Sequence, residues 1–145
     1  MKSTRIHDQN GQRTFAIVLD KGEEAMACLQ RFVEAETVSA AQITAIGAFS
    51  HATVAFWDPA TRAYEKHAVA EQTEVLSLLG DVSVEASGKP KLHLHAVLGR
   101  RDASTVGGHF VDGKVHPTLE IIVTESPAHL RRVFDETLGL AVIKL

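Results

Sequence analysis

Short apolar runs that end at turn residues occupy most of the chain between residues 40 and 123. Runs of this kind are typical of β-strands. They predict strands over Ile43–Phe49, Thr53–Trp57, Tyr64–Val69, Glu74–Leu79, Val82–Glu85, Leu92–Leu98, Gly107–Val111 and Val115–Thr124. Two more strands are expected nearer the ends, over Thr14–Leu19 and Leu140–Leu145, the first preceded by the hairpin signal Asn10-Gly11. Because the turns are short, the strands should pair mostly antiparallel.

Two segments show the spacing of amphipathic helices instead. Glu23–Glu36 is the first, and its apolar positions are Ala25, Met26, Leu29, Phe32 and Val33. The second follows Ser126 and Pro127, which suit an N-cap and a first helical turn, and Gly139 is a plausible stop. Its expected apolar face consists of Leu130, Val133, Phe134 and Leu138.

The order of these elements predicts one α/β (α+β) domain over residues 1–145, with two helices flanking a central, mostly antiparallel sheet. Several strands are apolar on both faces, among them Ile17–Leu19, Ile43–Ile46 and Ile121–Val123. Two helices cannot cover so much apolar surface. A second copy of the chain could cover the remaining face, and a closed barrel or sandwich would solve the same problem within one chain.

Composition places the chain among ordinary globular proteins. It has 145 residues and a mass of 15.7 kDa, with 45% hydrophobic and 23% charged residues. The single cysteine, Cys28, excludes an internal disulfide and falls in a helical apolar pattern that predicts a buried, inert thiol. The polar N-terminus and the lack of a long apolar run predict a cytoplasmic protein with no membrane partner.

Charge argues against a dedicated nucleic-acid binder. The net charge is −3 and the isoelectric point is about 6.2, whereas such binders usually carry a basic patch. The longest basic runs are the pairs Arg100–Arg101 and Arg131–Arg132, which we interpret as solvated surface.

Three histidines could meet on adjacent strands. His93 and His95 lie two residues apart, so their side chains project from the same face of the strand Leu92–Leu98. His109 follows two glycines, which permit close backbone approach, and an antiparallel neighbour would return it towards the pair. Three imidazoles that leave one position open are typical of a catalytic-type zinc site. Imidazole also binds copper, nickel and iron, so the sequence predicts a divalent transition metal with zinc preferred.

The alternative is that these histidines only form hydrogen bonds with one another and with the backbone. Glu120 is a further candidate, because it interrupts the apolar run Leu119–Val123 and a buried carboxylate needs a partner. It could be a fourth ligand, a hydrogen-bond partner of a ligand, or a catalytic general base. It could equally be a solvated edge residue.

The other histidines and the known sequence motifs add little. His51 and His116 are weaker candidates for the site, and His7, His67 and His129 lie in polar contexts. The chain has no phosphate-binding loop of the Walker type, no GxSxG elbow and no HExxH motif. Cys28 has no feature of a nucleophile.

The order of six segments resembles the PPC (plants and prokaryotes conserved) domain family, also called PCC. The segments are LDKGE at 19–23, AIGAF at 45–49, LSLLGD at 76–81, LHLHAVLG at 92–99, GGHF at 107–110 and VHPTLE at 115–120. The resemblance implies an antiparallel sheet flanked by helices, a homotrimer, and a meeting of His93, His95 and His109 in space. Plant relatives carry an AT-hook of the Arg-Gly-Arg-Pro type, which these 145 residues lack, so DNA binding is doubtful here.

Three functions therefore remain open. The first is a trimeric metal-binding domain that binds or transforms a small molecule, and whether it is an enzyme is left undecided. The second is a DNA-binding or regulatory protein, as the family is often described. The third is a structural assembly module that presents a surface to a partner.

Overall fold

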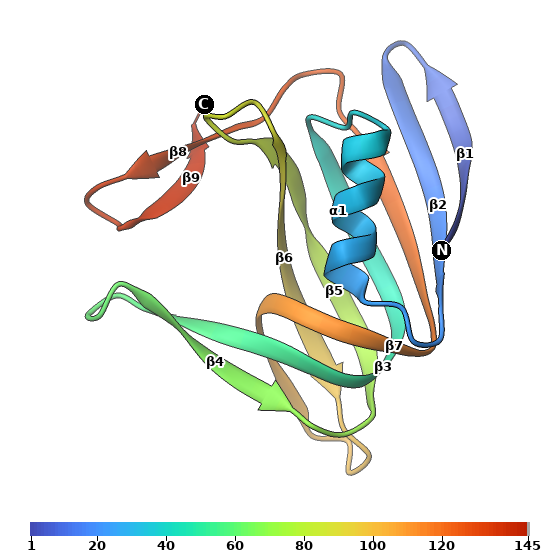
Figure 1. Cartoon of the computed structure of the whole chain (residues 1–145), viewed down its shortest axis with the longest axis vertical. Coiled ribbons are helices and arrows are strands. Elements are labelled where there is room, and N and C mark those ends of the chain that lie inside the picture. The colour runs from blue at the N-terminus through green and yellow to red at the C-terminus, as the bar shows by residue number, and fades with distance from the viewer. Residues whose placement is uncertain (145) are drawn as a thin grey trace.

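The computed structural model describes residues 1–144, which form nine β-strands and one α-helix (Figure 1). The elements are β1 (Lys2–Gln9), β2 (Gln12–Asp20), α1 (Ala25–Ala35), β3 (Ala41–Asp58), β4 (Ala63–Val69), β5 (Thr73–Val84), β6 (Pro90–Gly99), β7 (Thr105–Glu125), β8 (Arg131–Asp135) and β9 (Leu140–Lys144). The fold is therefore mostly β, with one helix among the described residues.

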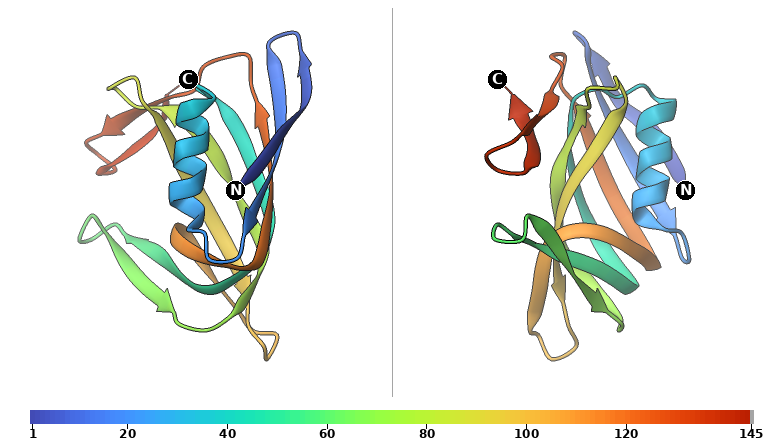
Figure 2. Two further views of the ribbon diagram at one scale, coloured as in Figure 1. Left: turned by 45° about the vertical axis from the view of Figure 1, so that its right-hand side comes forward. Right: turned by 60° about the vertical axis from the view of Figure 1, so that its left-hand side comes forward.

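The strands form a single, strongly curved sheet. Its main path runs β1-β2-β7-β3-β5-β8-β9, β4 pairs with β3, and β6 pairs with both β5 and β7. The expected antiparallel pairing is confirmed, and the parallel exception is a short contact between β5 and β8. In Figure 2 the long strands β3, β5, β6 and β7 bend together, and α1 lies against one face.

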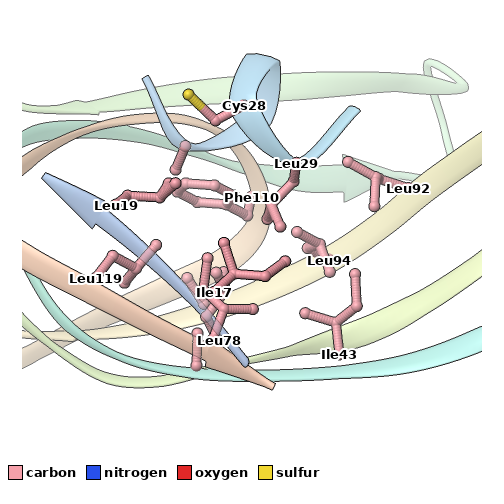
Figure 3. Close-up of a cluster of buried hydrophobic side chains, with 14 of the residues drawn as sticks. Ile17, Leu19, Cys28, Leu29, Ile43, Leu78, Leu92, Leu94, Phe110 and Leu119 are labelled. Atoms are coloured by element: carbon pink, nitrogen blue, oxygen red, sulfur yellow. The ribbon is translucent and has the colours of Figure 1, made fainter. Parts of the chain in front are cut away.

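The helix α1 confirms the first helical prediction. The carboxylate of Glu24 caps it by accepting hydrogen bonds from the backbone N–H groups of Met26 and Ala27, at 3.1 and 2.7 Å. Its buried face packs into the core shown in Figure 3 and consists of Ala25, Cys28, Leu29, Phe32 and Val33. Cys28 is 2% exposed, as predicted, and burial raises the pKa of its thiol.

No helix within residues 1–144 is both long enough and apolar enough to span a bilayer.

The second predicted helix is wrong, because the residues after Ser126 form the hairpin β8–β9 instead. The carboxylate of Asp135 accepts hydrogen bonds from the backbone N–H groups of Thr137 and Leu138, which closes a turn. Gly139, which was expected to end a helix, has φ +72° in that turn. The apolar side chains that suggested a buried helical face are exposed here, with Phe134 at 56%.

Three long strands replace pairs of shorter predicted ones. β3, β5 and β7 each continue through residues that were expected to break them, such as Asp112 and Gly113 in β7. The ladder between β3 and β7 shifts register at three places, and β3–β5 and β5–β6 each shift once. Such β-bulges bend a strand without ending it, and they interrupt the alternation of apolar and polar residues much as a turn does.

One face of the sheet carries exposed apolar side chains. We call this the open face and define it by Val18, Ile46, Leu76, Leu79 and Ile122, which are 36–61% exposed. The helix packs on β6 and β7 from the other side. The sequence predicts that too few helices are available to cover the apolar surface of the sheet. The structure of residues 1–144 shows the same shortage, because the open face is left uncovered.

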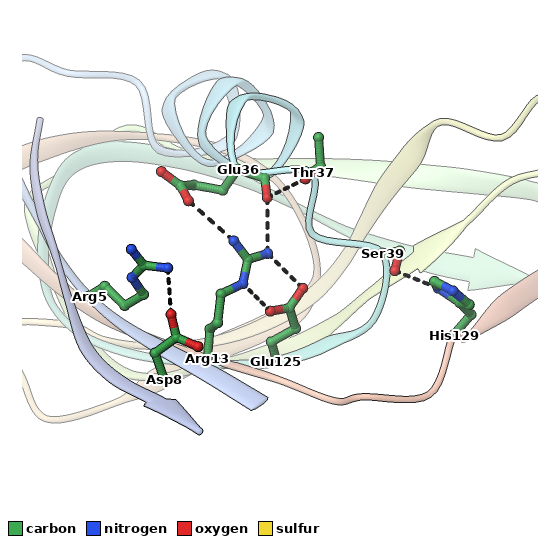
Figure 4. A network of polar contacts seen from close by, with 8 residues as sticks. All are labelled: Arg5, Asp8, Arg13, Glu36, Thr37, Ser39, Glu125 and His129. Atoms are coloured by element: carbon green, nitrogen blue, oxygen red, sulfur yellow. Dashed lines mark hydrogen bonds and ion pairs between the residues drawn. The ribbon is translucent and has the colours of Figure 1, made fainter. Parts of the chain in front are cut away.

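An ion-pair network anchors the start of β2 to the end of β7 and to the end of the helix. Arg13 contacts the carboxylate of Glu125 through Nε and Nη2, at 2.5 and 2.8 Å, and donates from Nη2 to the carbonyl oxygen of Glu36 at 3.0 Å (Figure 4). Glu125 is only 8% exposed, and a buried carboxylate needs a nearby cation. The guanidinium of Arg13 compensates its charge.

Candidate functional site

The strand β6 separates an imidazole face from a core face. Leu92, Leu94 and Ala96 are at most 4% exposed and belong to the hydrophobic core. His93 and His95 alternate with them and are partly or fully accessible. The period of two residues along a strand therefore puts both imidazoles on one side, as predicted.

β7 brings the third histidine to this pair. His109 is the direct partner of His95 in the antiparallel ladder between β6 and β7. The preceding glycines make this approach sterically possible. A Cβ atom on Gly107 would lie 2.5 Å from the carbonyl oxygen of Ala96, and one on Gly108 would lie 2.6 Å from that of Ala55.

The three imidazoles form a compact triangle. Ring centroids lie 5.2 Å apart for His93–His95 and for His93–His109, and 5.5 Å apart for His95–His109. One nitrogen from each ring lies within 4.8 Å of the others. Ligands of a tetrahedral zinc ion lie about 3.4 Å from one another, so small ring rotations would suffice to bind one.

The histidines suit a metal in their protonation as well as in their position. Burial, together with the nearby charges of His93 and His95, lowers the pKa of His109 to about 4. Burial and His93 also lower the pKa of His95. Nδ1 of His109 is buried and has no hydrogen-bond partner among the described residues. Neutral imidazoles with unused nitrogens are the form that binds a metal.

An aromatic stack holds the ring of His109 in place. Tyr64, on β4, stacks on this imidazole with a centroid distance of 4.5 Å and an interplanar angle of 26°. Trp57, on β3, packs edge-on against Tyr64 at 5.0 Å. The paired strands β3 and β4 thus form one wall of the site.

A charged pair supports His93 from the other side. Oδ2 of Asp81 lies 3.8 Å from Nδ1 of His93 and accepts a hydrogen bond from Nη2 of Arg132 at 2.8 Å. Burial alone would raise the pKa of Asp81, but the hydrogen bond with His93 and the charge of Arg132 lower it below its ordinary value. Nε of Arg132 donates to Ser83 at 3.0 Å, which ties β8 to β5.

A cavity of about 920 Å³ opens beside the histidines. His93 and His109 contribute to its lining. The rest of the wall comes from α1, β4, the turn between β5 and β6, β6, β7 and the β8–β9 hairpin. In Figure 1 the hairpin and the arm formed by β3 and β4 stand on either side of this part of the molecule. The volume is in the range of small-molecule sites.

Comparison with known families decides what kind of domain this is. The Plants and Prokaryotes Conserved (PCC) domain family matches residues 6–127. The chain belongs to this family. A search of curated proteins finds no match.

Solved structures agree with this assignment. A metal-containing protein from Archaeoglobus fulgidus is 34% identical, with a TM-score of 0.84, and the match covers 91% of this PCC chain and 93% of that chain. A plant- and prokaryote-conserved protein from Pyrococcus horikoshii is 25% identical, with a TM-score of 0.84 and coverage of 99% and 95%. A candidate DNA-binding protein from Bacteroides thetaiotaomicron is 25% identical, with a TM-score of 0.85 and coverage of 98% and 96%.

Glu120 of this PCC protein does not join the histidines within one chain. It is exposed on the sheet face opposite α1, where it pairs with Val18 and Ile46 in the ladders on either side. β7 pairs directly with β6 only over Thr105–His109, and Glu120 lies eleven residues beyond His109. At Glu120 the way across the sheet to β6 runs through β3 and β5, which is three strand spacings or about 14 Å. Its role as a ligand, a ligand partner or a general base stays a prediction.

The weaker candidates also lie elsewhere. His51 is exposed and contacts the hydroxyl of its neighbour Ser50 at 3.2 Å. His116 has a buried Nδ1 without a hydrogen-bond partner among the described residues, and it precedes a cis peptide bond to Pro117. Neither residue belongs to the cluster that could hold an ion.

Sequence reasoning missed three residues that shape the site: Tyr64, Asp81 and Arg132. The solvated interpretation of the pair Arg131–Arg132 is wrong for Arg132, whose side chain is only 11% exposed. No local signal marks that residue, because its partners lie on β5 and β6. Asp81 falls within the LSLLGD segment of the family resemblance, which was the one available hint.

Proposed function

We propose that this PCC protein binds one divalent transition metal per chain through His93, His95 and His109, and that zinc is the preferred ion. The observation that carries the proposal is the meeting of three imidazole nitrogens within 4.8 Å of one another. The lowered pKa values of His95 and His109 support it, because both imidazoles are neutral at pH 7. The Archaeoglobus fulgidus relative, which is described as metal-containing, supports it as well.

The site would serve a small molecule. His93 and His109 border the 920 Å³ cavity, so an ion held there would face its interior. Three protein ligands leave a coordination position for a ligand, as in catalytic zinc sites. A bound ion would supply Lewis acidity, which polarises an oxygen atom of that ligand. The chain's own contribution is to orient the imidazoles through Tyr64 and Asp81.

The working form would be a homotrimer. The open face exposes large apolar side chains on neighbouring strands, and a further copy of the chain would remove them from water. The family resemblance supports three copies rather than two.

Metal content of protein purified without an affinity tag tests the proposal. We expect about one equivalent per chain, and a sharp loss in each of the variants His93→Ala, His95→Ala and His109→Ala, since ligands of one ion act together. His51→Ala is the matched control, because His51 is an exposed histidine outside the cluster. Full metal content in all three ligand variants would reject the site.

DNA binding is the second candidate, favoured by the Bacteroides thetaiotaomicron relative. The net charge of −3 opposes it, since phosphate contacts dominate non-specific affinity. A gel-shift experiment at two salt concentrations separates the two functions. Strong binding at low salt that weakens steeply at higher salt would favour DNA, whereas no shift at low salt would count against it.

A further inference from the structure

The cavity beside the histidines exists because two strands separate there. β6 pairs with β7 only over His95–Gly99, so the edge of its first half faces open space on that side. β7 turns away from it after His109 to pair with β3. The β8–β9 hairpin reaches across from β5 and encloses the space on its far side.

Cations gather around the histidine end of this cavity. Lys91 lies two residues before His93 on β6, and Lys66 lies two residues after Tyr64 on β4, so each lysine shares a strand face with a residue of the site. Arg132 completes the positive lining. A divalent ion on neutral imidazoles would add two further positive charges.

Little negative charge opposes these cations. Glu85 is the one carboxylate among the lining residues that the structure describes, and it pairs with Lys91 at 3.5 Å. Asp81 compensates Arg132 at 2.8 Å. Lys66 makes no ion pair with any residue in 1–144, so its charge is available to a ligand.

Apart from Tyr64 and Ser87, the remainder of the cavity lining is apolar. Its floor includes Leu92 and Phe110, which are buried in the core. The hairpin contributes Phe134 and Ile143, which are 56% and 37% exposed, together with Leu140. Large apolar side chains that line a hollow and remain in water would be covered by an apolar ligand body.

We propose that the cavity binds an organic carboxylate with an apolar body, with its carboxylate at the end formed by His93, His109, Lys66 and Lys91, and its apolar body against the β8–β9 hairpin. This ligand class rests on the proposed small-molecule role of the site and makes it specific. Positive charge at one end and apolar walls at the other disfavour an amine, and they disfavour a polyanion without an apolar part.

Three probes of equal length test the chemistry: octanoate, 1-octanol and octylammonium. Calorimetry measures their affinities, and the fluorescence of Trp57, the only tryptophan in the chain, provides a second readout through its contact with Tyr64. We expect octanoate to bind about 10-fold more tightly than octanol and more tightly still than octylammonium. Butanoate and hexadecanoate then show whether the apolar body is that of a small acid or of a fatty acid.

Variants locate the two ends of the ligand. Lys66→Met and Lys91→Met should each weaken octanoate about 3- to 10-fold and leave octanol unchanged. Lys21→Met is the matched control, since this exposed lysine lies in the turn after β2 and outside the cavity. Phe134→Ser should weaken octanoate and octanol equally, and its exposed position means that the fold should persist.

The same titrations with metal-loaded and EDTA-treated protein separate this inference from the proposed metal site. Protein that holds no metal but prefers octanoate through Lys66 and Lys91 would reject the metal site and support the carboxylate. Protein that holds its metal but binds octanoate no better than octanol or octylammonium would overturn the carboxylate proposal. Equal octanoate affinity in the Lys66, Lys91 and Lys21 variants would also overturn it.

Discussion

Arg132 donates a hydrogen bond to His93, with Nη2 of the guanidinium 3.0 Å from Nδ1 of the imidazole. Arginine has no acceptor, so Nδ1 carries the lone pair in this arrangement. If His93 binds a metal through Nε2, the ring proton must instead lie on Nδ1. The acceptor at hand is Oδ2 of Asp81, 3.8 Å away. Metal binding should therefore change the hydrogen-bond partner of His93 Nδ1 from the guanidinium of Arg132 to the carboxylate of Asp81.

Asp81→Asn tests this exchange. The amide keeps the shape of the side chain but weakens its acceptor strength towards His93, so metal affinity should fall about 10- to 100-fold. Competition against a chelator measures it. Asp8→Asn is the control, because Asp8 forms an exposed ion pair with Arg5 on another part of the sheet. Equal metal affinities in the two variants would contradict a supporting role for Asp81.

The stability of the metal-free protein should depend on pH through His109. Burial lowers the pKa of this imidazole to about 4 in the folded chain, whereas an unfolded histidine titrates near 6.5. Between these values the unfolded chain binds more protons, so stability is complete above about pH 6.5 and falls as pH drops towards 4. Because the ring is only half-buried, we expect a loss of about 1–2 kcal/mol.

Urea unfolding of EDTA-treated protein at several pH values measures this loss. His109→Asn should reduce the slope of the profile, because it removes this titrating group, while His95, whose pKa is also lowered by burial, still contributes. The exposed residue His7 provides a matched control, and His7→Asn should leave the profile as it is. A profile that keeps its full slope in His109→Asn would assign the effect to another group.

The residues of β6 and of the hairpin β8–β9 show how far sequence reasoning reaches. Alternation in β6 gave the correct faces for His93 and Leu94, because a strand buried on one side must repeat every second residue. The hairpin failed, since Phe134 and Leu138 happen to fall at helical spacing although neither is buried. Its position depends on Arg132 and its partners on β5 and β6, which are contacts that no local pattern encodes.

The polar edge strand β1 was missed for a related reason. Every residue of Lys2–Gln9 is exposed. Because neither face of this strand is buried, its sequence has no alternation of apolar and polar residues that would reveal a strand. Charged side chains such as Lys2 and Arg5 protect an edge strand from pairing with other chains. The turn Asn10-Gly11 that joins it to β2 was correctly predicted, because both residues adopt a positive φ.

Arg13→Met should destabilise the fold. It leaves the nearly buried carboxylate of Glu125 without its cation, and removal of one partner of such a pair costs about 2–4 kcal/mol. Arg5→Met is the matched control, since Arg5 contacts Asp8 at 2.6 Å but both side chains are about half exposed, and no measurable change is expected. Urea unfolding measures both variants, and equal stabilities would contradict the distinction.

Glu120→Gln should leave metal affinity unchanged. The carboxylate lies on the open face, about three strand spacings from His95, so it cannot reach an ion held by the histidines of its own chain. Metal content and chelator competition check this expectation. A clear loss of affinity would show that a neighbouring copy carries its Glu120 to the site, and would revive the role predicted from the sequence.

Ile46→Lys tests the homotrimer. Ile46 is the most exposed member of the open face, at 61%, so a lysine there should leave the fold of one chain intact. A charge buried between copies without a partner is costly, so the variant should dissociate. Light scattering should give about three times 15.7 kDa for the parent protein and 15.7 kDa for the variant at micromolar concentration.

Ile6→Lys is the matched control for Ile46→Lys. Ile6 is an isoleucine of nearly equal exposure, 57%, but it lies on the edge strand β1 rather than on the open face, so its variant should remain associated. Dissociation of both variants would show that charge alone disrupts the assembly, and a parent protein of 15.7 kDa would reject the trimer. Because His93, His95 and His109 meet within one chain, the dissociated Ile46→Lys variant should still bind its metal. Loss of metal on dissociation would mean that a neighbouring copy completes the site.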